Sequence, residues 1–268
     1  MLPLITEPEE LQKHLGDPQL LIIDLCKPDI HAQGHLPGAQ HLDYSNLIIG
    51  QKPAPGQMPD TDFLVEVLSE LGLDSDKHVV AYDDEGSGKA CRLLWTLDLL
   101  GHKNGSLLNG GLHSWAGEDR PLVGEPGPAP ATTDFKAQPD NSVIADKNYI
   151  LANLENPDVR LLDARSIDEF NGVKVLAVRG GHIPGAVNFE WLSAIDYENN
   201  MRMKPVEILQ PLMQELGIEP DKEIITYCQT HHRSAHSYIM LKAMGYEKVR
   251  GYLGSWSDWG NDPGTPVE

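Results

Sequence analysis

Cys228 is the residue of this 268-residue chain that is best placed to do chemistry. It follows an apolar run that ends at Tyr227, and helical spacing of apolar residues begins soon after it, near Ala235. A thiol between a buried strand and a helix start meets unpaired backbone N–H groups and the positive end of the helix dipole. Both stabilise the thiolate, which is the reactive form of cysteine. The sequence therefore predicts a nucleophile in a loop that can hold an anion.

The loop after Cys228 supplies the expected substrate-binding groups. Arg233 ends the loop, and its guanidinium group can bind a sulfonate or carboxylate through two parallel charge-assisted hydrogen bonds. A second positive charge is expected from Arg179, which directly precedes a Gly-Gly-His-Ile-Pro-Gly-Ala turn. The other predicted substrate-binding residues lie between Cys228 and the helix: Gln229, Thr230, His231, His232 and Ser234.

Two simpler interpretations compete with these assignments. A lone cysteine beside an apolar strand is often a buried small hydrophobe, and this is our interpretation of Cys26 and Cys91. His231, His232 and His236 include a pair one helical turn apart, but neither a carboxylate nor a second cysteine falls at a matching spacing. We therefore expect no metal, and covalent catalysis by a thiolate requires no organic cofactor.

The two halves of the chain repeat one pattern. The corresponding segments are the apolar runs 20–24 and 159–163, the turns 34–39 and 181–186, and the runs 76–82 and 221–227. Each half also carries an amphipathic helical pattern that ends at a glycine, Gly72 in the first half and Gly217 in the second. Short apolar runs that alternate with such helices are typical of an α/β domain with a mainly parallel sheet covered by helices on both faces.

The repeat predicts the domain organisation. We expect a first domain at residues 1–122, a linker rich in proline and glycine at 123–141, and a second domain at 142–268. Asp83 stands in the first half where the second half has Cys228. The first domain is therefore expected to be non-catalytic.

Composition limits the classes of partner. The formal net charge of −19 opposes nucleic-acid binding, which needs a basic surface. No apolar run reaches the length of about 18 residues that crosses a bilayer, so no membrane partner is expected. The first residues show no secretory signal pattern. The number of cysteines, three, is odd, which argues against a disulfide framework. We expect a cytoplasmic monomer.

These motifs together resemble the two-domain rhodanese sulfurtransferases over nearly the whole chain. The resemblance rests on the tandem halves, the Gly-His-[Ile/Leu]-Pro-Gly-Ala turn in both, Asp83 opposite Cys228, and the segment Gly254–Trp259. The loop Cys-Gln-Thr-His-His-Arg resembles that of a bacterial subgroup from Azotobacter and pseudomonads. In this family only the second domain carries the cysteine, which becomes a persulfide.

The resemblance implies a sulfurtransferase that moves a sulfane sulfur from thiosulfate, or a related anion, through a persulfide on Cys228. The acceptor would be cyanide or a thiol, with a sulfur-accepting protein as a further possibility. A 3-mercaptopyruvate sulfurtransferase is the first alternative, and a persulfide carrier is another. The last is a cysteine phosphatase of the rhodanese fold, but such enzymes have five residues between cysteine and arginine, whereas four separate Cys228 from Arg233.

Overall fold

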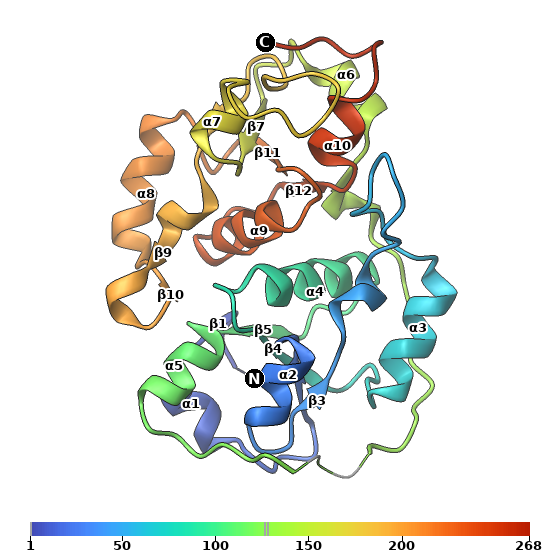
Figure 1. The fold of residues 1–268 in the computed structure, drawn as a ribbon, viewed down its shortest axis with the longest axis vertical. Coiled ribbons are helices and arrows are strands. Elements are labelled where there is room, and N and C mark those ends of the chain that lie inside the picture. The colour runs from blue at the N-terminus through green and yellow to red at the C-terminus, as the bar shows by residue number, and fades with distance from the viewer. Residues whose placement is uncertain (1, 126, 128) are drawn as a thin grey trace. The chain divides into compact units, whose positions relative to one another are not determined.

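The computed structural model describes residues 2–125, 127 and 129–268, which form two α/β units (Figure 1). Met1 and two prolines of the expected linker, Pro126 and Pro128, lie outside the described residues. The units consist of residues 1–47, 59–140 and 195–203, and of residues 48–58, 141–194 and 204–268. One of the places where the chain changes unit lies between Asp140 and Asn141.

The elements of the first unit follow the predicted alternation of strands and helices. In chain order they are β1 (Ile5–Thr6), α1 (Pro8–Lys13), β2 (Leu20–Asp24), α2 (Pro28–Gln33), β3 (Gln40–His41), α3 (Thr61–Glu70), β4 (His78–Tyr82), α4 (Gly88–Leu99), β5 (Gly105–Leu108) and α5 (Gly111–Gly117).

The second unit repeats this succession. Its elements are β6 (Ile144–Ala145), α6 (Lys147–Asn153), β7 (Val159–Asp163), α7 (Ile167–Phe170), β8 (Val187–Asn188), α8 (Val206–Glu215), β11 (Glu223–Tyr227), α9 (Arg233–Ala243), β12 (Val249–Tyr252) and α10 (Ser255–Trp259). The helices expected before Gly72 and Gly217 are α3 and α8.

Both units contain a five-stranded sheet with the same strand order. The order is β1-β5-β4-β2-β3 in the first and β6-β12-β11-β7-β8 in the second, and all neighbouring strands are parallel. The predicted fold class, two tandem α/β domains with parallel sheets, is confirmed. Because parallel strands end at one edge of a sheet, β11 and β7 bring Tyr227 opposite Asp163. Cys228, the residue after Tyr227, therefore lies at that edge of the sheet.

The core of each unit is built from corresponding residues. Trp115 and Trp259 are fully buried, and their indole N–H groups donate to the carbonyls of Pro121 and Pro266 at 2.8 and 2.7 Å. Tyr82 and Tyr227 each accept a backbone N–H at 3.2 Å from the turn that repeats in both halves, at Leu36 and Ile183. Both tyrosines also bond a buried aspartate. The turn is therefore tied to the central strand in the same way twice.

Two segments belong to the unit of the other half of the sequence. Residues 48–58, from the first half, are part of the second unit, and residues 195–203, from the second half, are part of the first. The latter contain an antiparallel pair, β9 (Ile195–Asp196) and β10 (Arg202–Met203). Arg202 forms an ion pair with Glu7 at 2.9 Å. The sequence pattern did not reveal this exchange of segments.

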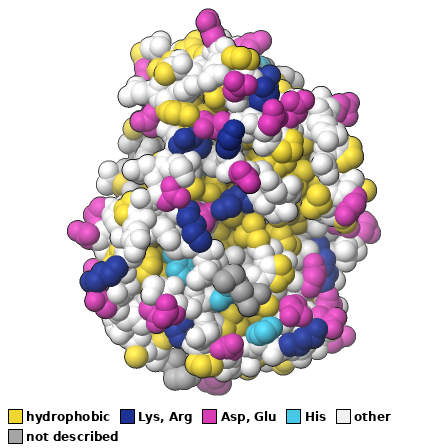
Figure 2. Space-filling model, turned by 180° about the vertical axis from the view of Figure 1, so that it is seen from behind, with side chains coloured by type: hydrophobic (Ala, Val, Ile, Leu, Met, Phe, Trp, Pro, Cys, Tyr) yellow, Lys and Arg dark blue, Asp and Glu magenta, His cyan; other side chains and the backbone are white. Residues whose placement is uncertain are grey.

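Charged side chains are mixed on the surface. On the face seen in Figure 2, Lys and Arg stand singly or in small groups with Asp and Glu between them. Any positive potential for an anionic substrate must then come from a few local groups. Among the described residues, no helix combines the length and the apolar character that crossing a membrane requires.

Candidate active site

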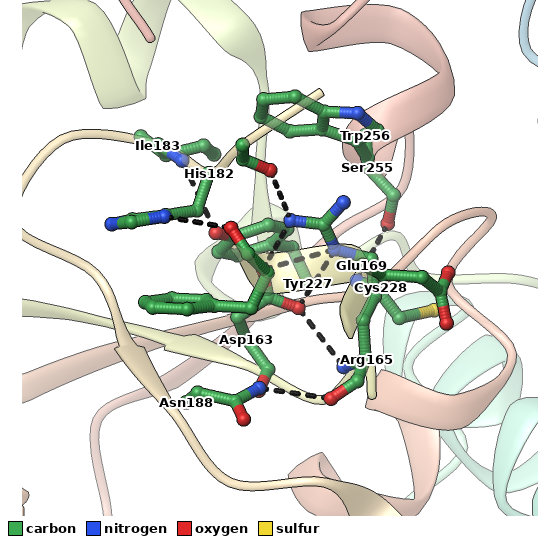
Figure 3. A network of polar contacts seen from close by, with 12 residues as sticks. Asp163, Arg165, Glu169, His182, Ile183, Asn188, Tyr227, Cys228, Ser255 and Trp256 are labelled. Atoms are coloured by element: carbon green, nitrogen blue, oxygen red, sulfur yellow. Dashed lines mark hydrogen bonds and ion pairs between the residues drawn. The ribbon is translucent and has the colours of Figure 1, made fainter. Parts of the chain in front are cut away.

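Cys228 lies directly after β11, and four residues separate it from the start of α9, as the sequence predicts. Its side chain is fully buried. Its backbone is held by the start of α10, because Cys228 N–H donates to Ser255 Oγ at 3.3 Å and its carbonyl accepts from the backbone N–H of Trp256 at 2.9 Å (Figure 3). The position of the sulfur is thus fixed by β11, by the start of α10 and by the helix that follows.

The surroundings of Cys228 favour the thiolate. Burial raises the pKa of the Cys228 thiol, but the charge of Arg233 and hydrogen bonds from Ser234 and Thr230 lower it by more. The net pKa lies below the ordinary value of a thiol. Burial raises the pKa of Cys26 and of Cys91 instead, and nearby aspartates add to the rise. Of the three cysteines, Cys228 alone has an environment that promotes a nucleophile.

Arg233 is engaged within the protein. Its Nη1 and Nη2 donate to Oε2 and Oε1 of Glu169 at 2.7 and 2.8 Å, a two-point pair between the start of α9 and α7. Glu169 is almost fully buried and also closes a capping box with Ser166 at the start of α7. The charge of Arg233 still lowers the pKa of Cys228, but both of its parallel donors already bond a carboxylate. Its direct part in donor binding remains a prediction.

Arg179 has a different environment from the one expected. Its guanidinium group donates to the carbonyl oxygens of Trp259 and Thr265 at 2.9 and 2.6 Å, and also to Asp262 O. These contacts connect Arg179 to the end of α10 and to the segment that follows it. A second substrate charge at Arg179 therefore remains only a prediction, and the observed contacts indicate a structural role.

The remaining loop residues differ in whether they contact the sulfur of Cys228. Thr230 and Ser234 supply N–H groups to it. Gln229 points elsewhere, since its Nε2 donates to Leu176 O at 3.1 Å, while its own backbone carbonyl accepts from Ser257 N–H at 3.0 Å. An alanine Cβ at Gly56, in the segment 48–58, would lie 2.1 Å from Thr230 O, so this segment approaches the loop at backbone distance. Sequence reasoning had not connected Gly56 with the loop.

The histidines of the loop pack rather than form a metal cluster. The rings of His232 and His236 lie 6.0 and 5.6 Å from the ring of Trp191. Burial lowers the pKa of His236 to about 4, with a smaller contribution from His232, so His236 is neutral at ordinary pH. Within residues 2–125, 127 and 129–268, no group of three His, Cys, Asp or Glu side chains is arranged to hold a metal ion.

Comparison with known proteins identifies this arrangement. The model of the rhodanese-like domain matches residues 7–118 and again residues 146–262. The chain belongs to the rhodanese family. The predicted resemblance is confirmed, and the cysteine loop of this rhodanese lies in the second matched region.

Curated relatives agree with the assignment over the full length. A thiosulfate sulfurtransferase of Azotobacter vinelandii is 47% identical over 267 residues, which are 100% of this chain and 97% of that protein. One of Pseudomonas aeruginosa is 43% identical, with the same shares covered. A protein of Thermus thermophilus named sulfur carrier protein TtuD is 32% identical over 96% of this chain and 93% of its own length.

A solved structure shares the fold. The anaerobic ergothioneine biosynthesis enzyme from Chlorobium limicola superposes with a TM-score of 0.87, covering 99% of this chain and 70% of that one. Its sequence is 22% identical, so the likeness concerns the fold alone.

A buried charged network supports the cysteine strand of this rhodanese. Arg165 donates from Nε and Nη2 to Asp163 at 3.0 and 2.6 Å, and both side chains are buried (Figure 3). The guanidinium carbon of Arg165 lies 4.5 Å from the ring centre of Trp256, whose backbone N–H donates to Cys228 O. Asn188 of β8 bonds Asp163 O at 3.0 Å. The repeat pairs Asp163 with Asp24 as strand ends, but the sequence pattern assigned neither Asp163 nor Arg165 to the site.

In the first unit, the loop that corresponds to the Cys228 loop binds a carboxylate of the protein itself. The buried carboxylate of Asp83, at the position of Cys228, accepts N–H groups from Glu85 and Ser87 on Oδ1 and from Lys89 and Ala90 on Oδ2, at 2.8 to 2.9 Å. Four converging backbone donors are an anion cradle. In this half the cradle is filled by the protein's own carboxylate, whereas in the second unit the buried thiol of Cys228 stands at the position of Asp83.

Replacing Asp83 by asparagine should destabilise the first unit without changing the site of the second. The amide nitrogen would face two backbone N–H donors in place of an acceptor, which we expect to lower the free energy of unfolding by about 2 kcal/mol. Urea unfolding monitored by hydrogen exchange in residues 78–99 measures this. The exposed Asp134→Asn in the same unit is the control, and equal stability of the two variants would contradict the cradle.

Proposed function

We propose that this rhodanese transfers a sulfane sulfur from thiosulfate to cyanide or a thiol through a persulfide on Cys228. The observation that carries the proposal is the Cys228 loop, in which a fully buried thiol has a lowered pKa. The printed names of the relatives from Azotobacter vinelandii and Pseudomonas aeruginosa support the choice of donor.

The reaction requires two displacements at sulfur. In the first, the Cys228 thiolate attacks the outer sulfur of thiosulfate, the S–S bond of the donor breaks, and sulfite leaves with the electron pair. Cys228 then carries one additional sulfur as an anionic persulfide. In the second, the acceptor attacks that outer sulfur, the new S–S bond breaks, and the Cys228 thiolate returns. Cyanide would leave as thiocyanate. Such a sequence gives ping-pong kinetics.

The loop has the properties that both displacements need. The thiolate and the persulfide are anions, and N–H groups from Thr230 and Ser234 together with the charge of Arg233 can stabilise them in a site without bulk water. Glu169 neutralises much of the charge of Arg233 toward an external ligand. The donor is therefore expected to be held by backbone N–H groups more than by arginine side chains.

The wider setting belongs to the same proposal. We expect a monomeric protein. We also expect it to be in the cytoplasm, and its three free cysteines support that compartment. A thiol or a sulfur-accepting protein is the alternative to cyanide as acceptor. The name of the Thermus thermophilus relative supports a carrier role as the second candidate.

A comparison of donors tests the proposal. With cyanide as acceptor, kcat/KM for thiosulfate should exceed that for 3-mercaptopyruvate by about tenfold or more on one preparation. The reverse preference would contradict the choice of thiosulfate. A stable persulfide with negligible turnover would instead favour the carrier, and hydrolysis of a phosphate ester without sulfur transfer would favour the phosphatase.

A further inference from the structure

Two residues around Cys228 adopt a backbone conformation that L-amino acids rarely take. His231 has φ of 55° and Ser255 has φ of 51°, both in the left-handed region. Each costs on the order of 1 kcal/mol in a residue other than glycine. In the first unit, Gly111 occupies the position of Ser255, with φ of 57°. The second unit therefore keeps a side chain at a place where the first unit uses glycine.

The hydrogen bonds of the Ser255 side chain explain why its strained backbone conformation is kept. Its Oγ accepts the N–H groups of Cys228 and His231 at 3.3 and 3.0 Å, and its hydroxyl donates to Tyr252 O at 2.8 Å. Ser255 thus fixes the backbone on both sides of Gln229 and Thr230. The backbone N–H of His231 is thus bound to Ser255, and the imidazole is the part of His231 that contacts Ser234.

The imidazole of His231 lies against a direct partner of the sulfur. Nδ1 of His231 is 2.8 Å from Oγ of Ser234, and both side chains are fully buried, as is that of Cys228. Ser234 lies in the first turn of α9 and bonds the sulfur through both its hydroxyl and its N–H. A chain of contacts therefore runs from His231 through Ser234 to Cys228.

The hydroxyl of Ser234 has one proton for two neighbours. If His231 Nδ1 carried no proton, the hydroxyl would donate to the imidazole, and its oxygen would face the sulfur. If Nδ1 carries the proton, it donates to Oγ, and the hydroxyl proton is left for the sulfur. A thiolate can only accept, so the second arrangement is the one that stabilises it.

We propose that His231 is a positioning residue whose Nδ1–H donates to Ser234 Oγ and thereby directs the Ser234 hydroxyl proton onto the sulfur of Cys228. This inference deepens the proposed function and rests on it. His231 touches neither donor nor acceptor in this role and acts through Ser234. In the left-handed backbone conformation of His231, Nδ1 lies 2.8 Å from the Ser234 hydroxyl.

The other charged groups near the sulfur do not replace this contact. The charged ones are Arg233 of α9, its partner Glu169 of α7, and the pair of Asp163 at the end of β7 and Arg165 beyond it; His232 and His236 are the neighbouring imidazoles. Glu169 has its pKa lowered to about 2, because the contacts with Arg233 and Ser166 outweigh its burial. The pair of Glu169 and Arg233 therefore keeps its charges at neutral pH.

The test is the pKa of Cys228 in His231→Gly, in Ser234→Ala and in the double variant. Glycine adopts the backbone conformation of His231 without strain, so His231→Gly removes the imidazole without adding backbone strain. The pKa is read from the pH dependence of iodoacetamide alkylation, quantified on the Cys228 peptide by mass spectrometry, and from the pH profile of kcat/KM for thiosulfate.

We expect each single variant to raise the pKa of Cys228 by about one unit, so that alkylation well below that pKa slows about tenfold. The double variant should be no worse than Ser234→Ala, because both changes remove the same hydrogen bond. The exposed His113→Asn of the first unit is the matched control and should leave the pKa unchanged.

An unchanged pKa in His231→Gly would overturn the proposal, as would effects that add in the double variant. The alkylation readout needs no sulfur transfer. It therefore tests the role of His231 even if thiosulfate proves not to be the donor. Absence of sulfur transfer from thiosulfate in the parent protein, together with the expected pKa shifts in the variants, would concern the proposed function alone.

Discussion

Replacing Cys228 by serine should lower kcat/KM for sulfur transfer from thiosulfate to cyanide by about 10⁴ or more, because the loss of a covalent nucleophile removes the whole pathway. A serine hydroxyl is not ionised at neutral pH and cannot form a persulfide. The N–H donors of Thr230 and Ser234 and the charge of Arg233 would remain, but they would surround a group that does not react. Thiocyanate production from thiosulfate and cyanide measures the effect.

Cys91→Ala is the matched control for this experiment. Cys91 is buried in α4 of the first unit, and burial raises the pKa of its thiol. Its removal should therefore leave turnover within about twofold of the parent, provided that the variant is folded. If Cys228→Ser retained a tenth of the activity or more, Cys228 would not be the nucleophile.

Replacing Glu169 by glutamine should lower the free energy of unfolding of the second unit by about 3 kcal/mol near neutral pH. The amide offers one acceptor oxygen where the carboxylate offered two, and it leaves the guanidinium group of Arg233 in a partly buried site without its counter-charge. Hydrogen exchange of α7 and α9 during urea unfolding measures the loss.

This effect should depend on pH with a definite sign. The pKa of Glu169 is lowered from 4.5 to about 2, since the hydrogen bonds and charge of Arg233 and the bonds of Ser166 exceed the opposing effect of burial. A lowered pKa in the folded state stabilises the fold above pH 4.5, and this contribution is lost as the pH falls toward 2. The difference between parent and Glu169→Gln should shrink over that window.

Glu155→Gln provides the control, because Glu155 is an exposed carboxylate of the same unit. It should change stability by less than about 0.5 kcal/mol. Equal stability of Glu169→Gln and Glu155→Gln at neutral pH would show that the pair with Arg233 contributes little. A difference between parent and Glu169→Gln that grew under acid would contradict the lowered pKa of Glu169.

The features that follow from local pattern could be predicted from the sequence. Alternating apolar runs and amphipathic helices indicated two parallel α/β domains, and the comparison of the halves revealed Asp83 opposite Cys228. Strand-loop-helix placement of Cys228 also followed, because the apolar run and the helical spacing are both local. The repeat also aligns Trp115 with Trp259, and both side chains are buried.

Contacts between distant segments could not be predicted in the same way. Arg233 looked like a free substrate-binding group, but its partner Glu169 lies 64 residues earlier in a helix of four residues. Arg179 likewise bonds carbonyls 80 and 86 residues away. Every residue has a backbone carbonyl, so the sequence does not show which of them accepts a hydrogen bond. Acidic residues number 40 in this chain, so the sequence does not show which of them pairs with a given arginine. The partners of both arginines therefore required the structure.

Detection of the persulfide on Cys228 by mass spectrometry tests the central claim most directly. The protein is treated with thiosulfate, freed of small molecules and digested without a reductant, and the Cys228 peptide is then weighed by mass spectrometry. We predict a gain of one sulfur atom on Cys228 alone, which disappears when cyanide is added and yields an equal amount of thiocyanate. A Cys228 peptide of unchanged mass, in a preparation that still turns over thiosulfate, would contradict a persulfide on this residue.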